Sequence, residues 1–85
     1  CELKDGNGCL ILGSTYIVIF EDNEKAKFYT EKSCDMDYGE GCEALGLRYE
    51  NGTYGFEVDK KKAKYFYKKA CKLGAKWSCK YEQAL

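Results

Sequence analysis

The chain has 85 residues with 14 basic and 14 acidic side chains, so its formal net charge is zero. This balance argues against a general nucleic-acid binder, which carries a basic excess. The chain contains six cysteines but no histidine, which removes the most common general acid–base group and the imidazole metal ligand. Its longest apolar run, residues 10–20, is shorter than the roughly 20 residues of a membrane-spanning helix, so no transmembrane segment is expected.

Four helices are predicted in chain order, at residues 8–17, 23–36, 41–50 and 60–73. Asp22 and Asp59 precede the second and the fourth as N-cap residues, whose carboxylates accept hydrogen bonds from first-turn N–H groups. The fourth carries an apolar stripe that ends at Leu73, and Gly74 then ends the helix. Residues 16–20 have high β-propensity, but we predict a helix end there because the matching residues of the second half end a helix.

The cysteines follow a period. They form three pairs whose members are eight positions apart, and the pairs recur after 33 and then 37 residues. Internal repeats of this length are typical of solenoid proteins. The pairs are Cys1 and Cys9, Cys34 and Cys42, and Cys71 and Cys79.

Each cysteine pair can form a disulfide only where the chain turns back on itself. Residues eight apart on a straight helix are about 12 Å apart, whereas a disulfide needs Cα atoms within about 7 Å. Glycines lie between the members of every pair, so we predict the bridges Cys1–Cys9, Cys34–Cys42 and Cys71–Cys79. The spacing is unlike that of structural zinc sites, and no metal or cofactor is expected. Disulfides indicate an oxidising compartment, for which we expect a secreted or periplasmic protein.

The residues between the cysteines also repeat, and they resemble a known family. The second unit reads Leu45-Gly46-x-x-Tyr49-x-x-Gly52, then Val58-Asp59, then Lys62-Ala63-x-x-Phe66-Tyr67-x-x-Ala70-Cys71. This pattern resembles the Sel1-like repeat, a relative of the tetratricopeptide repeat. The regular cysteine pairs are similar to those of the cysteine-rich, secreted Sel1-repeat subfamily first described in Helicobacter. Two departures are Glu21, where the other unit has Val58, and Glu82-Gln83, where Leu-Gly is expected.

The resemblance implies an all-α fold, a right-handed superhelical solenoid of helix pairs, stapled here by the disulfides. It also implies a bacterial binding protein whose concave face takes a protein or an extended peptide. The expected division is residues 1–8 as the end of a preceding repeat, 9–41 and 42–78 as two repeats, and 79–85 as the start of a further or capping helix.

The same resemblance also implies an alternative function as an enzyme, because members of this subfamily are commonly described as β-lactamases or penicillin-binding proteins. The alternative partner is then a β-lactam or a peptidoglycan-related small molecule. Serine enzymes of this kind use Ser-x-x-Lys. Ser14, Ser33 and Ser78 are not followed by lysine at the third position, and a zinc enzyme would need histidines, so no catalytic residue is predicted.

The charges are unevenly distributed. Residues 1–57 hold 12 acidic and 5 basic side chains, a net charge of −7, whereas residues 58–85 hold 2 acidic and 9 basic ones, a net charge of +7. Three interpretations stay open: an ordinary lysine-covered helix surface, the steering of a charged partner, or head-to-tail stacking against further repeats. The glutamates near residues 40–50 are likewise either a solvated helix face or a pair of catalytic carboxylates of the glycosidase type.

A strip of residues on the first helix of each repeat is the predicted partner-binding surface. It suits an extended peptide with apolar and basic residues, and Trp77 is its best anchor because tryptophan is enriched in binding hot spots. The alternative for Trp77 is that its ring only packs over the nearby disulfide. The strip comprises Asn7, Leu10, Ser14, Ile17, Glu40, Glu43, Leu47, Glu50, Trp77, Lys80 and Ala84.

Overall fold

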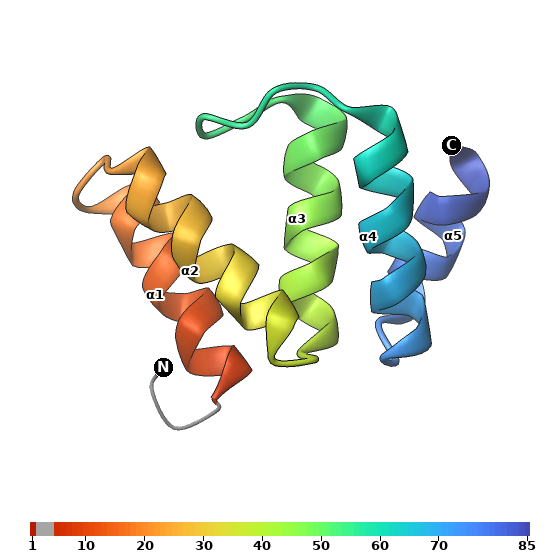
Figure 1. Ribbon diagram of the computed structural model, residues 1–85, viewed down its shortest axis with the longest axis horizontal. Coiled ribbons are helices and arrows are strands. Elements are labelled where there is room, and N and C mark those ends of the chain that lie inside the picture. Colours follow the sequence, from red (N-terminus) through yellow and green to blue (C-terminus); the bar gives the residue numbers. More distant parts are fainter. Residues whose placement is uncertain (2–4) are drawn as a thin grey trace.

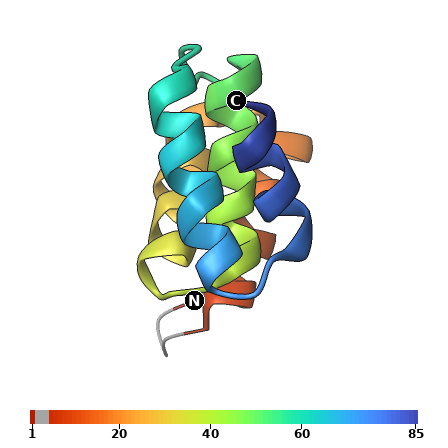
Figure 2. The same ribbon diagram turned by 90° about the vertical axis from the view of Figure 1, so that its right-hand side faces the viewer.

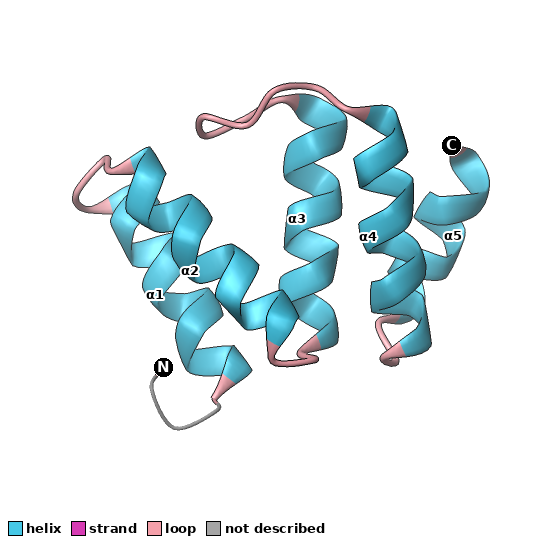
Figure 3. Ribbon diagram, viewed as in Figure 1, coloured by secondary structure: helices cyan, strands magenta, loops and turns pink. Residues whose placement is uncertain are grey.

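The computed structural model describes residue 1 and residues 5–85, and within these it contains five α-helices and no strand (Figures 1 and 3). The all-α prediction is therefore confirmed. The helices are α1 (Gly6–Val18), α2 (Asn23–Asp35), α3 (Gly39–Asn51), α4 (Lys60–Lys72) and α5 (Lys76–Ala84). Part of the segment predicted to end a preceding repeat, at residues 2–4, lies outside the described residues.

Aspartates begin three of the helices. The carboxylates of Asp22 and Asp59 each accept a hydrogen bond of 3.1 Å from a backbone N–H of the first turn, which confirms their N-cap roles. Asp5 caps α1 in the same way, through the N–H of Gly8 at 3.0 Å. Because of this cap α1 begins two residues earlier than predicted, at Gly6.

The end of α4 follows the predicted signal, and α3 ends in the same way. Gly52 and Gly74 have φ values of 65° and 100° after α3 and α4, a left-handed backbone that glycine adopts without a Cβ clash. Residues 16–18 belong to α1 and not to a strand, as predicted. Leu73 differs from the prediction, because it is the C-cap residue of α4 and its side chain is 38% exposed.

Each helix packs mainly against its neighbours in the chain. α1 contacts α2, α3 contacts α4, and the pairs are joined by α2 against α3 and by α4 against α5. α1 also contacts α3, so α1, α3 and α5 lie towards one face, with α2 and α4 on the other (Figure 2). Contacts confined to neighbouring units are the defining property of a solenoid.

The core between α3 and α4 depends on a glycine. Tyr67 is fully buried, and its ring lies so close to Gly46 that a Cβ there would be 2.5 Å from the Tyr67 Cδ1 atom. Tyr49 stacks on Phe66 with ring centroids 5.7 Å apart and meets the edge of Phe56 at 5.0 Å. The buried residues of this core are Cys34, Cys42, Leu45, Tyr49, Phe56, Ala63, Tyr67 and Ala70.

Candidate functional site

All six cysteines are paired as predicted, and they hold the helix junctions. The Cα–Cα distances are 4.6 Å for Cys1–Cys9, 4.5 Å for Cys34–Cys42 and 4.8 Å for Cys71–Cys79. The second bridge joins the last turn of α2 to the first turn of α3, and the third joins α4 to α5. No free thiol is present within the described residues, so the cysteines act there as structural cross-links. Three disulfides indicate an oxidising compartment.

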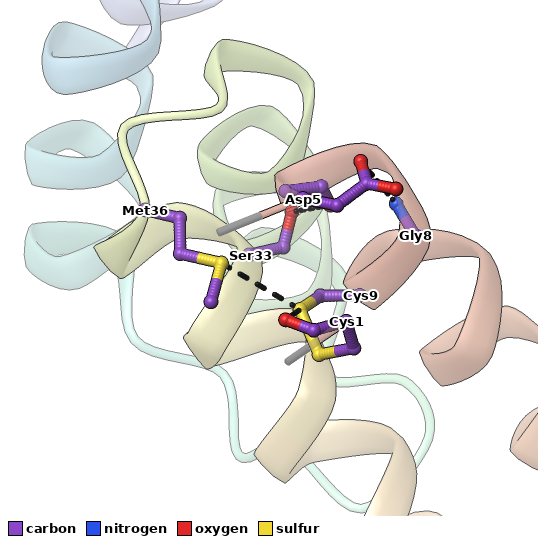
Figure 4. Close-up of a disulfide and its surroundings, with 7 residues drawn as sticks. Cys1, Asp5, Gly8, Cys9, Ser33 and Met36 are labelled. Atoms are coloured by element: carbon purple, nitrogen blue, oxygen red, sulfur yellow. Dashed lines mark hydrogen bonds between the residues drawn. A yellow bond between two sulfur atoms is a disulfide. The ribbon is translucent and has the colours of Figure 1, made fainter. Parts of the chain in front are cut away.

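Two side chains at the end of α2, Ser33 and the C-cap residue Met36, contact the start of α1 and the first disulfide (Figure 4). The Met36 Sδ atom lies 3.7 Å from the Cys9 Sγ atom, and the buried Ser33 hydroxyl donates a 2.7 Å hydrogen bond to the carbonyl of Gly6. The start of α1 is thereby fixed to the end of α2 as well as to Cys1.

The cavity most relevant to the predicted strip lies where α1, α3 and α5 meet. It has a volume of about 440 Å³, and we call it the central groove. Five predicted partner-binding residues line it: Leu10, Glu40, Glu43, Leu47 and Trp77. The tertiary structure therefore brings together residues that are up to 67 positions apart in the sequence.

The Trp77 ring projects largely into solvent at the rim of the central groove. Its side chain is 63% exposed, and the ammonium group of Lys80 lies 5.0 Å from its ring centroid. Such cation–π contacts at exposed sites contribute about 0.5–1 kcal/mol. Trp77 lines the groove, whereas Lys80 is not among the lining residues and lies against the Trp77 ring.

Ser14 and Ile17 lie on α1 beyond the central groove. Ser14 lines an apolar hollow of about 400 Å³ along α1, with Leu10 among its other walls. Ser14 and Ile17 both line a smaller hollow of about 150 Å³ next to Arg48.

The predicted residues Asn7 and Glu50 have partners within the fold. The Asn7 amide lies 3.2 Å from the hydroxyl of Tyr38, whose proton is donated to Glu40, and Glu50 accepts a 2.6 Å hydrogen bond from the hydroxyl of Tyr67. Burial raises the pKa of Tyr67, and its hydrogen bond to the Glu50 carboxylate raises it further.

The other two glutamates of the strip also accept hydrogen bonds. Glu43 accepts one of 2.9 Å from the buried hydroxyl of Ser78, which joins α3 to α5. Glu40 accepts one of 2.9 Å from Tyr38, and this bond is the largest cause of a raised pKa of the Tyr38 phenol. Glu43 thus supports the fold, whereas Glu40 is exposed at the groove.

The serines do not form a catalytic arrangement in the described chain. Ser33 and Ser78 are fully buried, and their hydroxyls donate to the Gly6 carbonyl and to Glu43. Ser14 is exposed, but a serine nucleophile needs an adjacent base, and neither of the hollows that Ser14 lines contains a lysine or a histidine.

Sequence reasoning missed Arg48, which the structure places beside the strip. Its guanidinium is half-buried and lies 5.2 Å from the ring of Tyr54 in the α3–α4 loop. Its Nη1 atom donates to the carbonyl of Ala44 at 3.4 Å, while its buried Nε atom has no hydrogen-bond partner in the described structure. One signal was available in the sequence, because Arg48 is the only arginine of a lysine-rich chain.

Antiparallel helix pairs that pack in chain order define an α-solenoid of helical repeats. The Sel1 repeat profile matches residues 9–38 and 39–74, and the chain belongs to the Sel1 repeat family. It is 38% identical over 58 residues, or 68% of its length, to Cytochrome c oxidase assembly factor 7A of Xenopus laevis. The values are the same for Cytochrome c oxidase assembly factor 7 of Xenopus tropicalis.

The chain spans only a quarter of these two relatives, since the matched region is 25% of each. No solved structure matches it. Among the described helices, none has the length and apolar character needed to cross a membrane.

Proposed function

We propose that this chain is a Sel1-repeat binding module that takes an extended peptide segment of a protein partner in the central groove. The carrying observation is that five residues chosen from the repeat pattern line one cavity of about 440 Å³ formed by α1, α3 and α5. Helical repeats of this family suggest a protein-interaction role.

The walls of the groove define the chemistry of the peptide. Leu10, Leu47 and Trp77 supply apolar surface, and Leu47 and Trp77 are 37% and 63% exposed. Exposed apolar side chains gathered at one concavity favour apolar side chains of a partner. The exposed carboxylate of Glu40, with Glu43 beside it, favours a basic residue.

Two broader points bear on the kind of partner and on the location of the protein. The relatives from Xenopus are named as assembly factors, a role that accords with contact between proteins. The three disulfides require an oxidising environment, and within that limit we propose a secreted or periplasmic location. No observation favours the β-lactamase alternative, so we do not propose it.

The test is binding of synthetic random decapeptides to the immobilised, oxidised protein, followed by fluorescence polarisation with the selected sequences. We expect Trp77→Ala to weaken binding by about tenfold or more, as for a hot-spot residue, and Leu47→Ala to weaken it less. Tyr65→Ala is the matched control, because this ring is 62% exposed on α4 and lies outside the groove.

If the selection enriches no peptide, the proposal is contradicted. Unchanged affinity of both groove variants, with native circular dichroism, would equally place the binding surface elsewhere on the molecule.

A further inference from the structure

The outer faces of α2 and α4 carry opposite charges at equivalent positions of the two repeats. Each residue of α2 corresponds to the residue 37 positions later in α4, as Cys34 corresponds to Cys71. The inward positions agree with this correspondence, because each buried residue of α4 matches a buried residue of α2. The buried pairs are Ala26 and Ala63, Thr30 and Tyr67, and Ser33 and Ala70. The two helices therefore also share their outward positions.

On α2 the outward positions form an acidic stripe around one aromatic ring. Its members are spaced by four, three and four residues, so they lie on one face of the helix. Glu31 is partly exposed, and the other three side chains are exposed. We call this set the α2 stripe, and it consists of Glu24, Phe28, Glu31 and Asp35.

On α4 the equivalent positions form a basic stripe around an aromatic ring. All four side chains are exposed. We call this set the α4 stripe, and it consists of Lys61, Tyr65, Lys68 and Lys72. Every carboxylate of the α2 stripe thus has a lysine as its counterpart. The two rings also correspond, since Phe28 is 58% exposed and Tyr65 is 62% exposed.

The charges of the two stripes are not engaged within the fold. In the described chain no hydrogen bond or cation–π contact involves their six charged side chains, whereas Lys60 contacts the Glu50 carbonyl. The other lysines of α2 lie beside its stripe, and their ammonium groups stand 5.1–5.9 Å from the centroids of aromatic rings. These lysines are Lys25, Lys27 and Lys32. The stripes are therefore free to meet charges of a partner.

The arrangement of α2 and α4 allows the partner to be a second copy of the chain. Both helices lie on the same broad face of a molecule that measures 33 × 27 × 15 Å, and both run from the top of Figure 1 to the bottom (Figures 1 and 2). Rotation by 180° about the line that bisects them within this face exchanges the two helices and keeps their direction. Each α2 of the resulting pair then runs along an α4 in the same direction.

We propose that the chain forms a two-fold symmetric dimer in which the α2 stripe of each copy packs along the α4 stripe of the other. Such an interface is isologous, so every contact occurs twice. With the helices in the same direction and in the repeat register, Phe28 meets the partner's Tyr65, and all three carboxylates meet lysines. These ion pairs are Glu24 with the partner's Lys61, Glu31 with the partner's Lys68, and Asp35 with the partner's Lys72.

The size and position of this face agree with such a dimer. A face of 33 × 27 Å is large enough for the roughly 800 Å² that each partner buries in a standard interface. The aromatic pair stands within the row of ion pairs, as aromatic rings do in binding hot spots. The central groove is formed by α1, α3 and α5 on the other face, so the dimer leaves it open and does not depend on the proposed function.

The first experiment is analytical ultracentrifugation of the oxidised protein over a range of concentrations. We expect a reversible dimer whose dissociation constant rises about tenfold or more between about 50 and about 500 mM NaCl, because salt screens exposed ion pairs. A monomer at every concentration in low salt would overturn the proposal.

Charge reversal tests the pairing itself. Glu31→Lys places a lysine against the partner's Lys68, and Lys68→Glu places a glutamate against the partner's Glu31, so each variant should weaken the dimer about tenfold or more. The double variant restores opposite charges and should regain most of the affinity. Glu82→Lys is the matched control, because it makes the same change of charge on α5, away from the two stripes.

A second readout uses the wild-type protein, so it does not depend on the folding of any variant. A carbodiimide joins a carboxylate to a nearby lysine, and an equal mixture of unlabelled and ¹⁵N-labelled protein distinguishes links between chains from links within one chain. Mass spectrometry should find Glu31 joined to Lys68 in peptides of mixed label. Links of one label alone would contradict the dimer.

The remaining outcomes test the interface and its register. A dimer that neither single reversal weakens would use another face and would contradict the proposal. A double variant as weak as the single variants would contradict the pairing of Glu31 with Lys68. Tyr65→Ala should weaken the dimer without changing the affinity for peptides, and Trp77→Ala should do the reverse, so the dimer and the groove are tested separately.

Discussion

The hydroxyl of Tyr67 donates a 2.6 Å hydrogen bond to the carboxylate of Glu50 and so ties α4 to α3. The Tyr67 ring is fully buried, and its position beside Gly46 directs its hydroxyl towards the end of α3. Glu50 was predicted as a residue of the partner strip, but its carboxylate contributes to the junction between the two helices.

This hydrogen bond predicts a loss of stability at high pH. Burial and the Glu50 carboxylate raise the pKa of Tyr67 above its ordinary value of 10.0, so the folded state favours the neutral phenol. The resulting stabilisation is complete below pH 10 and is lost as the pH rises above it, because the unfolded chain releases the proton first. Urea unfolding at increasing pH should show a steeper decline for the wild type than for Tyr67→Phe.

The control for this prediction is Glu50→Gln, which keeps an acceptor but removes the charge. The free energy of unfolding of Glu50→Gln should fall with pH less steeply than that of the wild type and more steeply than that of Tyr67→Phe. Identical slopes for the wild type and Tyr67→Phe above pH 10 would contradict the role assigned to this hydrogen bond.

Because α3 and α4 approach each other closely at Gly46, adding one methyl group there should lower the free energy of unfolding. In Gly46→Ala the new Cβ would be 2.5 Å from the Tyr67 ring, which is closer than van der Waals contact, so the helices must separate. We expect the free energy of unfolding to fall by about 1–3 kcal/mol, as for other overpacked cores, measured by urea denaturation. Gly39→Ala should cost less, because its nearest contact is the Leu73 Cβ atom at 3.3 Å, so only a small shift of that side chain is needed.

The disulfides should contribute strongly to thermal stability, since the core is small. Each bridge closes a loop of nine residues, for which chain entropy predicts about 2.5 kcal/mol. Replacing Cys34 and Cys42 together by alanine should lower the melting temperature by about 10 °C or more in calorimetry. An unchanged melting temperature would show that the Cys34–Cys42 disulfide does not stabilise the fold.

The three bridges should also differ in how fast they are reduced. Cys34 and Cys42 are almost completely buried, whereas Cys71 and Cys79 are partly exposed. Mass spectrometry after partial reduction and alkylation should therefore find label on Cys71 and Cys79 before Cys34 and Cys42. The reverse order would contradict the packing described here.

The N-cap of α4 can be tested directly. Asp59→Ala removes the acceptor of the 3.1 Å hydrogen bond to the Lys62 N–H and should cost about 0.5–2 kcal/mol in thermal denaturation. Asp59→Asn, which keeps a side-chain oxygen, should cost clearly less. Equal losses in the two variants would mean that charge, and not the hydrogen bond, is the main contribution of the cap.

The sequence by itself determined the local and periodic features of this protein. Aspartate caps, glycine stops and apolar stripes act between residues at most a few positions apart, so they fixed α2 and α4 closely. The eight-residue cysteine spacing fixed the bridges, because it recurs three times and can close only at a turn. The recurrence of this spacing also indicated the internal repeat, whose residue pattern in turn indicated the Sel1 repeat family.

The tertiary structure alone decided which of the strip residues meet and which are occupied within the fold. The partners of Glu50 and Glu43 are 17 and 35 residues away, and nothing in their local sequence indicates them. The half-burial of Arg48 depends on how α1 and the α3–α4 loop close around α3. Burial and hydrogen bonding of such side chains are set by the packing of several helices, which local sequence signals do not encode.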